Sequence, residues 1–91
     1  MLHIVCYDIS EDKTRHQMSE CLLDFGVRIQ ESVFECVLDG HGYVRMMEAV
    51  NKVPIENTDR LRVYKVCQTC TESIQIYGPG EVTHDPDYYV V

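Results

Sequence analysis

Apolar and polar positions along the chain follow two different periods, which predict strands and helices in a definite order. Residues 2–8 alternate in part and are rich in strand-forming side chains, so they predict a strand. The polar residues 10–12 then offer N-cap candidates for a helix. Apolar side chains recur at helical spacing from Met18 to Phe25, and Gly26 stands where this helix is expected to stop.

The stretch 27–39 is longer than a usual strand, which has about 5–6 residues. We therefore expect it to break near Glu31–Ser32 into two antiparallel strands. A turn over residues 39–42 leads to a second helical stripe, which Pro54 closes. That stripe consists of Tyr43, Met46, Met47 and Val50.

Two further strands are predicted near the C-terminal end. Residues 61–67 form a run rich in strand-forming side chains, and residues 73–77 resemble a shorter one. The resulting order predicts an α+β fold, namely a ferredoxin-like βαββαβ arrangement with an extra C-terminal strand. We expect this domain to span residues 1–78 and to be followed by a tail, residues 79–91.

The predicted sheet has more surface than two helices can cover. Both helices of this arrangement lie on one face, so the other face needs a different cover. A second copy of the same chain is the simplest cover, and the sequence therefore predicts a homodimer.

Length and composition limit the classes of function. A chain of 91 residues is expected to form one domain, and it has no apolar run near the roughly 20 residues that cross a bilayer. Without a recognisable export signal at its start, it is expected to be cytoplasmic and not bound to a membrane. The net charge of −7 disfavours broad, non-specific binding of nucleic acid. A nucleic-acid contact would then need a focused basic patch, a metal ion or a basic partner.

Five cysteines are present, and in a reducing compartment we expect them to be small buried apolar residues. Cys67 and Cys70 form a C-x-x-C pair, which supplies two of the four ligands that a structural zinc usually has. Zinc shared across a dimer is one interpretation, and core packing is the favoured one. No predicted helix is placed to make the pair a thioredoxin-like redox site.

The candidate chemistry lies around Asp8, the acid at the end of the first predicted strand. A carboxylate at this position is a candidate ligand for Mg²⁺, and a two-fold dimer would double it; the alternative is a turn or cap residue. Lys13, Arg15 and Arg28 are candidates to grip a phosphate near Asp8, although a solvated charge is the commoner role of a lone arginine. The four histidines are scattered and support no nucleophilic triad.

The end of the chain is acidic and then apolar. This stretch is either frayed or a docking segment for a partner protein. The candidate docking residues are Tyr88, Tyr89, Val90 and Val91.

Three segments, in this order, resemble one known family. They are YDISEDKTR (7–15), GVRIQESVFEC (26–36) and DRLRVYKVCQTC (59–70), and the string R-x-Q-x-S-V-F-E in the second is the most specific. The chain resembles the small second CRISPR-associated (Cas) protein family over residues 2–78.

The resemblance implies a ferredoxin-like homodimer that acts as a Mg²⁺-dependent endonuclease on single-stranded RNA or double-stranded DNA. It also implies a bridge between dimers of the CRISPR integrase during capture of foreign DNA, with the tail touching the integrase. By its position, Asp8 would be the metal-binding catalytic residue, with Arg15 and Arg28 near it. Tyr7 and Phe34 would support that site.

Several functions therefore remain open at the level of sequence. The chain is expected to be a CRISPR adaptation protein, either a metal-dependent nuclease or a purely non-catalytic scaffold. A toxin-type ribonuclease of the same fold is the alternative. A ferredoxin-like regulator that binds a small ligand is a further alternative, for which no sequence motif is present.

Overall fold

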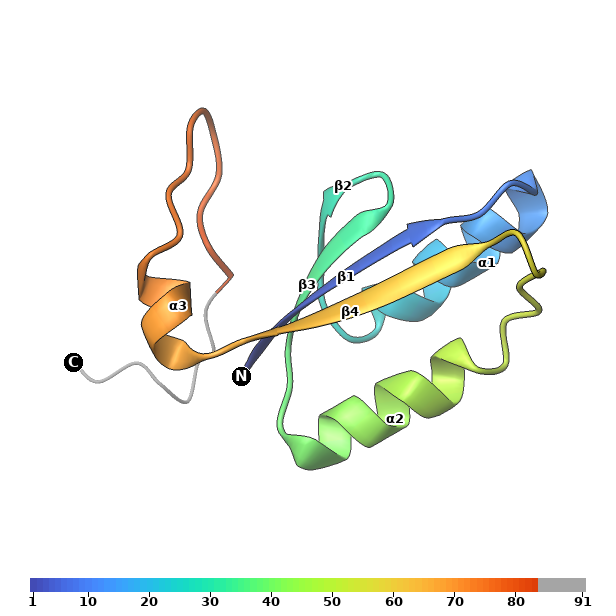
Figure 1. Ribbon diagram of the computed structural model, residues 1–91, viewed down its shortest axis with the longest axis horizontal. Helices are drawn as coiled ribbons and strands as arrows, with labels where there is room; N and C mark the ends of the chain where they lie inside the picture. The colour runs from blue at the N-terminus through green and yellow to red at the C-terminus, as the bar shows by residue number, and fades with distance from the viewer. Residues whose placement is uncertain (84–91) are drawn as a thin grey trace.

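The computed structural model describes residues 1–83 and contains four strands and three helices in that part of the chain (Figure 1). In chain order they are β1 (Leu2–Asp8), α1 (Asp12–Leu23), β2 (Val27–Gln30), β3 (Val33–Val37), α2 (Gly40–Val50), β4 (Arg60–Val66) and α3 (Gln68–Glu72).

The four strands form one antiparallel sheet in the order β2-β3-β1-β4. The central strand β1 pairs with β4 along its whole length, from Leu2 opposite Val66 to Asp8 opposite Arg60. This order confirms the predicted α+β, ferredoxin-like arrangement. The predicted break at Glu31–Ser32 is also confirmed, because β2 ends at Gln30 and β3 begins at Val33.

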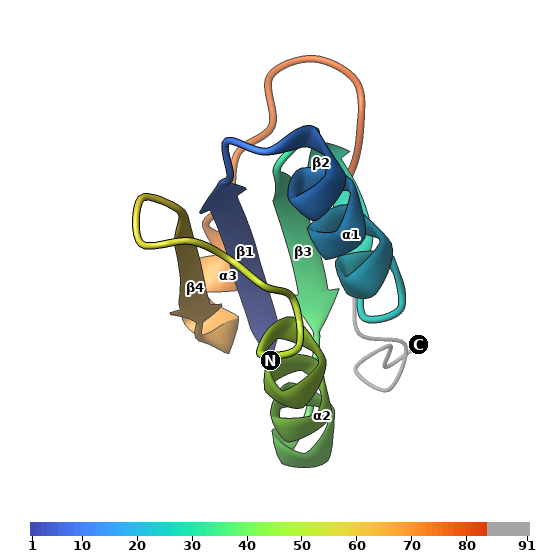
Figure 2. The ribbon, with the colours of Figure 1, turned by 90° about the vertical axis from the view of Figure 1, so that its right-hand side faces the viewer.

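One face of the sheet is covered by helices α1 and α2 (Figure 2). Because neighbouring residues of a strand point to opposite faces, the odd-numbered residues of β1 point to this helix layer. Val5, opposite Phe34 of β3, is fully buried there. The buried core consists of Val5, Tyr7, Ile9, Met18, Leu22, Phe34, Cys36, Leu38, Met46, Val50 and Val53.

The other face of the sheet, which we call the open face, has no such helix layer. The open face includes Ile4, Cys6, Val33, Glu35, Val37, Arg62, Tyr64 and Val66. Helix α3 and the loop after it lie on this side of the sheet (Figure 2). Leu2, at the end of the face nearest α3, is buried, whereas Tyr64 is 47% exposed. The helices thus leave much of this face uncovered, as the two-helix pattern predicts.

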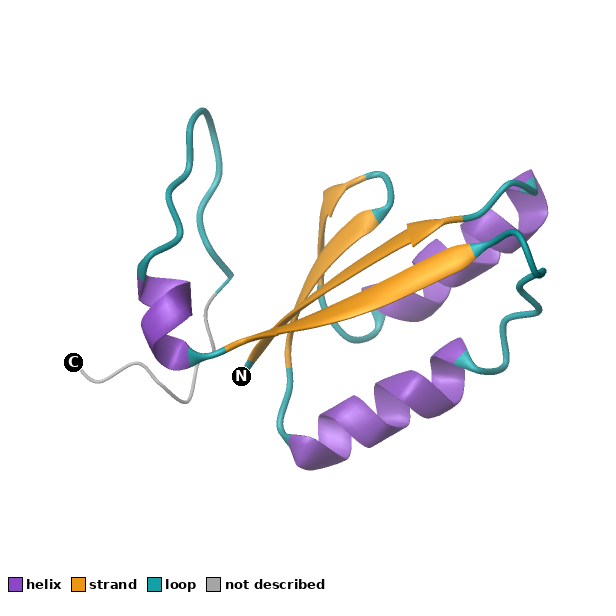
Figure 3. Cartoon of the chain, viewed as in Figure 1, coloured by secondary structure: helices purple, strands orange, loops and turns teal. Residues whose placement is uncertain are grey.

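The predicted extra C-terminal strand over residues 73–77 is absent from the single chain. After α3 the chain runs as a loop that projects away from the sheet (Figure 3). Tyr77 is 89% exposed, and positive φ angles at Gly78 and Gly80 turn the loop back. A strand needs a neighbour for its backbone hydrogen bonds, and α3 leads this segment away from the free edge of β4.

Helix ends also depart slightly from the sequence pattern. Helix α2 begins at Gly40, inside the predicted turn, because the Asp39 side chain accepts a hydrogen bond of 2.7 Å from the Gly42 amide. Helix α1 ends at Leu23, and the Gly26 amide still donates to the Leu22 carbonyl at 3.1 Å. Over residues 1–83, every helix is too short or too polar to pass through a lipid bilayer.

Candidate nucleic-acid and metal site

Asp8 is the last residue of the central strand and is exposed. It alternates with Tyr7, which points to the helix layer, so Asp8 belongs to the opposite side with Ile4 and Cys6. Among residues 1–83, no hydrogen bond or ion pair of its carboxylate is found. The carboxylate can therefore accept a ligand without first breaking a bond to these residues.

Two arginines of β4 lie on the same side as Asp8. The pairing of β1 with β4 places Arg60 opposite Asp8 and Arg62 opposite Cys6. Side chains directly opposite on neighbouring strands have Cβ atoms about 4.5–5.5 Å apart. The guanidinium of Arg62 donates to the Tyr64 hydroxyl at 3.1 Å. Sequence reasoning did not assign these arginines, although the R-x-R spacing in a strand puts both on one face.

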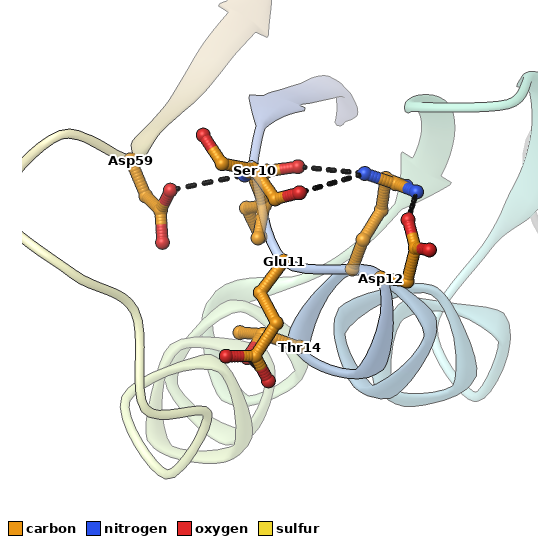
Figure 4. A network of polar contacts seen from close by, with 7 residues as sticks. Ser10, Glu11, Asp12, Thr14 and Asp59 are labelled. Atoms are coloured by element: carbon orange, nitrogen blue, oxygen red, sulfur yellow. Dashed lines mark hydrogen bonds and ion pairs between the residues drawn. The ribbon is translucent and has the colours of Figure 1, made fainter.

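Arg15 holds the connection between β1 and α1. Its Nη1 donates to the carbonyls of Ile9 at 3.0 Å and Ser10 at 3.4 Å, and its Nη2 pairs with the Asp12 carboxylate (Figure 4). Ser10 is also held from the other side, because its amide donates to Asp59 Oδ1 at 3.2 Å. Arg15 thus fixes the backbone that directly follows Asp8.

A groove of about 300 Å³ lies between α1 and the start of the β2–β3 hairpin. Its lining residues are Asp12, Arg15, His16, Ser19, Glu20, Arg28 and Glu31. Arg15 and Arg28, two of the three cations in the phosphate-grip hypothesis, therefore share one groove, which Lys13 does not line. Three carboxylates share it too, so the groove is not a uniformly basic surface.

Tyr7 and Phe34 build the support beneath this groove. Their rings stack with centroids 6.3 Å apart, and the Tyr7 hydroxyl donates to the Glu31 carbonyl at 3.1 Å. The Arg28 guanidinium lies over the Phe34 ring, 5.4 Å from its centroid. Both aromatic rings are buried, which is consistent with the supporting role expected for them.

The predicted site residues do not form one cluster. Arg15 and Arg28 meet in the groove, whereas Asp8 does not line it. Since Arg28 is opposite Phe34, it belongs to the helix side of the sheet, and Asp8 belongs to the open face. Lys13 is exposed on the first turn of α1. The sheet thus separates the carboxylate from the arginine that was expected beside it.

One chain supplies few metal ligands. Residues 1–83 contain no group of three or more His, Cys, Asp or Glu side chains that could hold a metal ion. Mg²⁺ is often held by only one or two protein carboxylates and keeps several waters. The Asp8 carboxylate would suit such an ion if a second copy of the chain contributed its own Asp8 carboxylate as a second ligand.

The expectation that all five cysteines are buried is wrong. Cys36 is buried and Cys6 and Cys21 are half-buried, but Cys67 and Cys70 are exposed. The favoured interpretation of the C-x-x-C pair as core packing therefore fails. The pair also opens a short helix, α3, which the sequence pattern did not predict. The candidate docking residues Tyr88, Tyr89, Val90 and Val91 lie outside the described residues.

Comparison with known proteins agrees with this fold. Residues 1–74 match the family model described as CRISPR associated protein Cas2. The chain is 37% identical to a CRISPR-associated endoribonuclease Cas2 of Chloroflexus aurantiacus, over the full length of both chains.

Two solved structures are similar in three dimensions. Cas2 of Streptococcus pyogenes has a TM-score of 0.73 and 25% identity, with 86% of this chain and 100% of that chain covered. A chain from a partial Cas6-RT-Cas1–Cas2 complex has a TM-score of 0.73 and 26% identity, with all of both chains covered.

Proposed function

The chain belongs to the Cas2 family of CRISPR-associated proteins, and on this basis we propose that it acts as a homodimer with the CRISPR integrase in the capture of foreign DNA. The similar chain in a Cas1–Cas2 complex supports an integrase partner. The relative named as an endoribonuclease supports a nuclease activity on RNA or DNA. Such a role requires access to the genome and agrees with the cytoplasmic location expected from the sequence.

The homodimer is supported by the open face. Tyr64 remains 47% exposed there, and Val27, which lies opposite Glu35 on the same face, remains 52% exposed, although both are large apolar side chains. Ile4, Val33 and Val37 on the same face are only partly buried. Covering this face with a second copy removes apolar surface from water, at roughly 25 cal/mol per Å².

The carboxylate of Asp8 carries the nuclease part of the proposal. Two copies joined through their open faces would each bring an Asp8 that has no partner among the described residues of its own chain. When bound by this pair, Mg²⁺ would supply charge neutralisation and an activated water. Asp8 would hold the ion, and Arg60 and Arg62 of each chain would orient the sugar–phosphate backbone from the same side.

The two arginines of the groove, Arg15 and Arg28, have secondary roles in this proposal. Arg28 lies over Phe34 and reaches solvent at the α1 side, where with Lys13 it would contact a phosphate further along the strand. Arg15 already donates to two backbone carbonyls and to Asp12, so it positions the connection after Asp8. The net charge of −7 per chain, or −14 for two, favours a basic partner such as a DNA-bound integrase.

One observation favours a second candidate, a scaffold that cuts nothing. Within residues 1–83, no group of three or more His, Cys, Asp or Glu side chains forms at the end of β1, which leaves few ligands for a catalytic metal centre. A dimer could then set the distance between two integrase dimers through its shape alone. The family membership favours both of these roles over a toxin-type ribonuclease.

The two candidates are separated by the variant Asp8→Asn in the full-length protein. Cleavage of single-stranded RNA and double-stranded DNA is measured at saturating Mg²⁺, and integration of a DNA fragment is measured with the integrase. We expect Asp8→Asn to lower cleavage at least about 100-fold, because the amide is a poorer metal ligand and carries no charge.

The matched control is Glu48→Gln, which makes the same change at an exposed acid of α2 on the far side of the sheet. It should cleave like the wild type. Undiminished cleavage by Asp8→Asn would remove the catalytic role of Asp8. Unchanged integration with lost cleavage would assign the protein a scaffold role in that step.

A further inference from the structure

The exposed pair Cys67 and Cys70 is a cluster of nucleophilic side chains that the proposed function does not use. Cys67 directly precedes α3, and Cys70 lies one helical turn later. The Cys70 amide donates to the Cys67 sulfur at 3.4 Å, and the Thr71 amide donates to the Cys67 carbonyl at 2.9 Å. This turn holds both sulfurs on one side of the helix, where solvent reaches them.

The two thiols differ from each other in a way that suits stepwise chemistry. Hydrogen bonds from the backbone and then from the side chain of Cys70 lower the pKa of Cys67. The same side-chain hydrogen bond raises the pKa of Cys70. Cys67 is therefore the better thiolate and Cys70 the better proton donor, which is the division of roles in an exchange-active pair.

Cys36 and Cys21 lack these properties. Burial raises the pKa of the Cys36 thiol to about 11. Burial first, and the nearby Asp24 second, raise the pKa of Cys21. Both side chains are also screened from reagents in solution, since Cys36 is buried and Cys21 half-buried. Cys6 is half-buried as well, so reactivity should concentrate at the exposed α3 pair.

We propose that Cys67 and Cys70 form a dithiol site that exchanges with low-molecular-weight disulfides and closes reversibly into an intramolecular disulfide. The Cys67 thiolate attacks one sulfur of the reagent, a mixed disulfide forms, and one reagent thiol leaves. The Cys70 thiolate then attacks the Cys67 sulfur, the intramolecular disulfide forms, and the second reagent thiol leaves. Two protein thiols are oxidised, one reagent disulfide is reduced, and the protons pass to the departing thiolates.

A metal site is less well supported by the same residues. Zinc usually takes four ligands, and the part of the chain from residue 1 to 83 offers no third His, Cys, Asp or Glu beside this pair. Closing a disulfide needs only the two sulfurs already in one turn. Helix α3 contains no buried residue and contributes none to the core, so closure disturbs no core contact.

The cysteine pair lies at the junction between β4 and the loop that follows α3, so a disulfide there would restrain that loop. The pair joins β4 to the loop that contains Thr83, whose amide and hydroxyl both donate to the Glu35 carboxylate on β3, at 3.2 and 2.6 Å. A bond between Cys67 and Cys70 would fix the turn from which this loop departs.

The test uses the reduced full-length protein and oxidised glutathione at pH 8, with the products followed by intact and peptide mass spectrometry. We expect the wild type to lose the mass of two hydrogen atoms, with the bond mapped to Cys67 and Cys70. Cys70→Ser should accumulate a single glutathione adduct on Cys67. Cys67→Ser should react about tenfold more slowly, because the activated thiol is gone.

Cys21→Ser is the matched control and should behave as the wild type. Adducts spread evenly over the five cysteines, equal rates for Cys67→Ser and Cys70→Ser, or a disulfide between chains on a non-reducing gel would each overturn the proposal. So would retention of added Zn²⁺ after dialysis together with complete protection of the pair, which would make it a metal site.

Discussion

His3 is a buried residue whose chemistry acts on stability and not on the candidate site. Its ring stacks on Tyr43 with centroids 5.4 Å apart, and its Nδ1 lies 2.9 Å from the Met1 carbonyl. Its Nε2 is buried and has no hydrogen-bond partner among residues 1–83. Burial lowers the pKa of His3, and the positive charges of the N-terminal amine and Lys65 act in the same direction.

This arrangement predicts a loss of stability in mild acid. Below pH 6.5 the unfolded chain binds a proton at His3 that the folded chain binds less readily, so the free energy of unfolding should fall as the pH falls through this range. One proton contributes at most about 1.4 kcal/mol per pH unit. Urea unfolding at pH 7.5 and 6.0 measures the change.

The control for this prediction is His3→Phe, which keeps an aromatic ring on Tyr43 and removes the titrating group. The difference between the two pH values should shrink in this variant. An equal difference in both proteins would mean that another group causes it.

At the residue scale, the sequence indicated which residues are candidates for the site better than it indicated which of them lie close together. The sequence predicted that Asp8 is the acid at the end of the first strand, and Asp8 is the last residue of β1. The expected approach of Arg28 to Asp8 is not seen because strand alternation puts them on opposite sides of the sheet. The exposure of Cys67 and Cys70 could not be predicted, because it depends on where the chain goes after β4.

At the scale of elements, Gly26 sets how closely α1 can approach the sheet. It stands between α1 and β2, and an added Cβ would lie 2.3 Å from the Glu35 carbonyl oxygen and 2.5 Å from the Cys36 sulfur. Its φ is not positive, so glycine is needed here for close approach and not for a left-handed turn.

Gly26→Ala should therefore destabilise the fold by about 1–3 kcal/mol, because a backbone carbonyl must move to admit the methyl group. Denaturant unfolding measures this effect. Gly40→Ala is the matched control, since nothing lies within 4 Å of its added Cβ. A Gly26→Ala protein as stable as Gly40→Ala would contradict the close approach.

Most elements could be predicted because their signals are local. Apolar periodicity marked both long helices, and the polar pair Glu31–Ser32 marked the hairpin. The failure at residues 73–77 has a physical reason: a run of strand-forming residues becomes a strand only where an edge is within reach to pair with it. Helix α3 has only five residues, too few for a periodic pattern.

At the scale of the whole molecule, the uneven covering of the sheet predicts self-association. Tyr64→Asp places a charge at the open face, so it should raise the dimer dissociation constant at least about tenfold. Analytical ultracentrifugation measures the constant.

The control for the dimer is Val44→Asp, because Val44 lies on α2 and its exposed fraction of 53% is similar to that of Tyr64. It should remain as dimeric as the wild type. A monomeric wild-type protein, or equal dissociation constants for the two variants, would show that the open face is not the dimer interface.

The pairing of β1 with β4 fixes the distance between two chemically distinct regions, the carboxylate site at Asp8 and the cysteine pair after β4. Asp8 and Arg60 form one end of this ladder of seven residue pairs, and Val66, next to Cys67, lies at the other end. Seven residues of strand measure about 20 Å. A nucleic acid bound at the first end and a small disulfide reacting at the second would not compete for surface, so one molecule could engage both simultaneously.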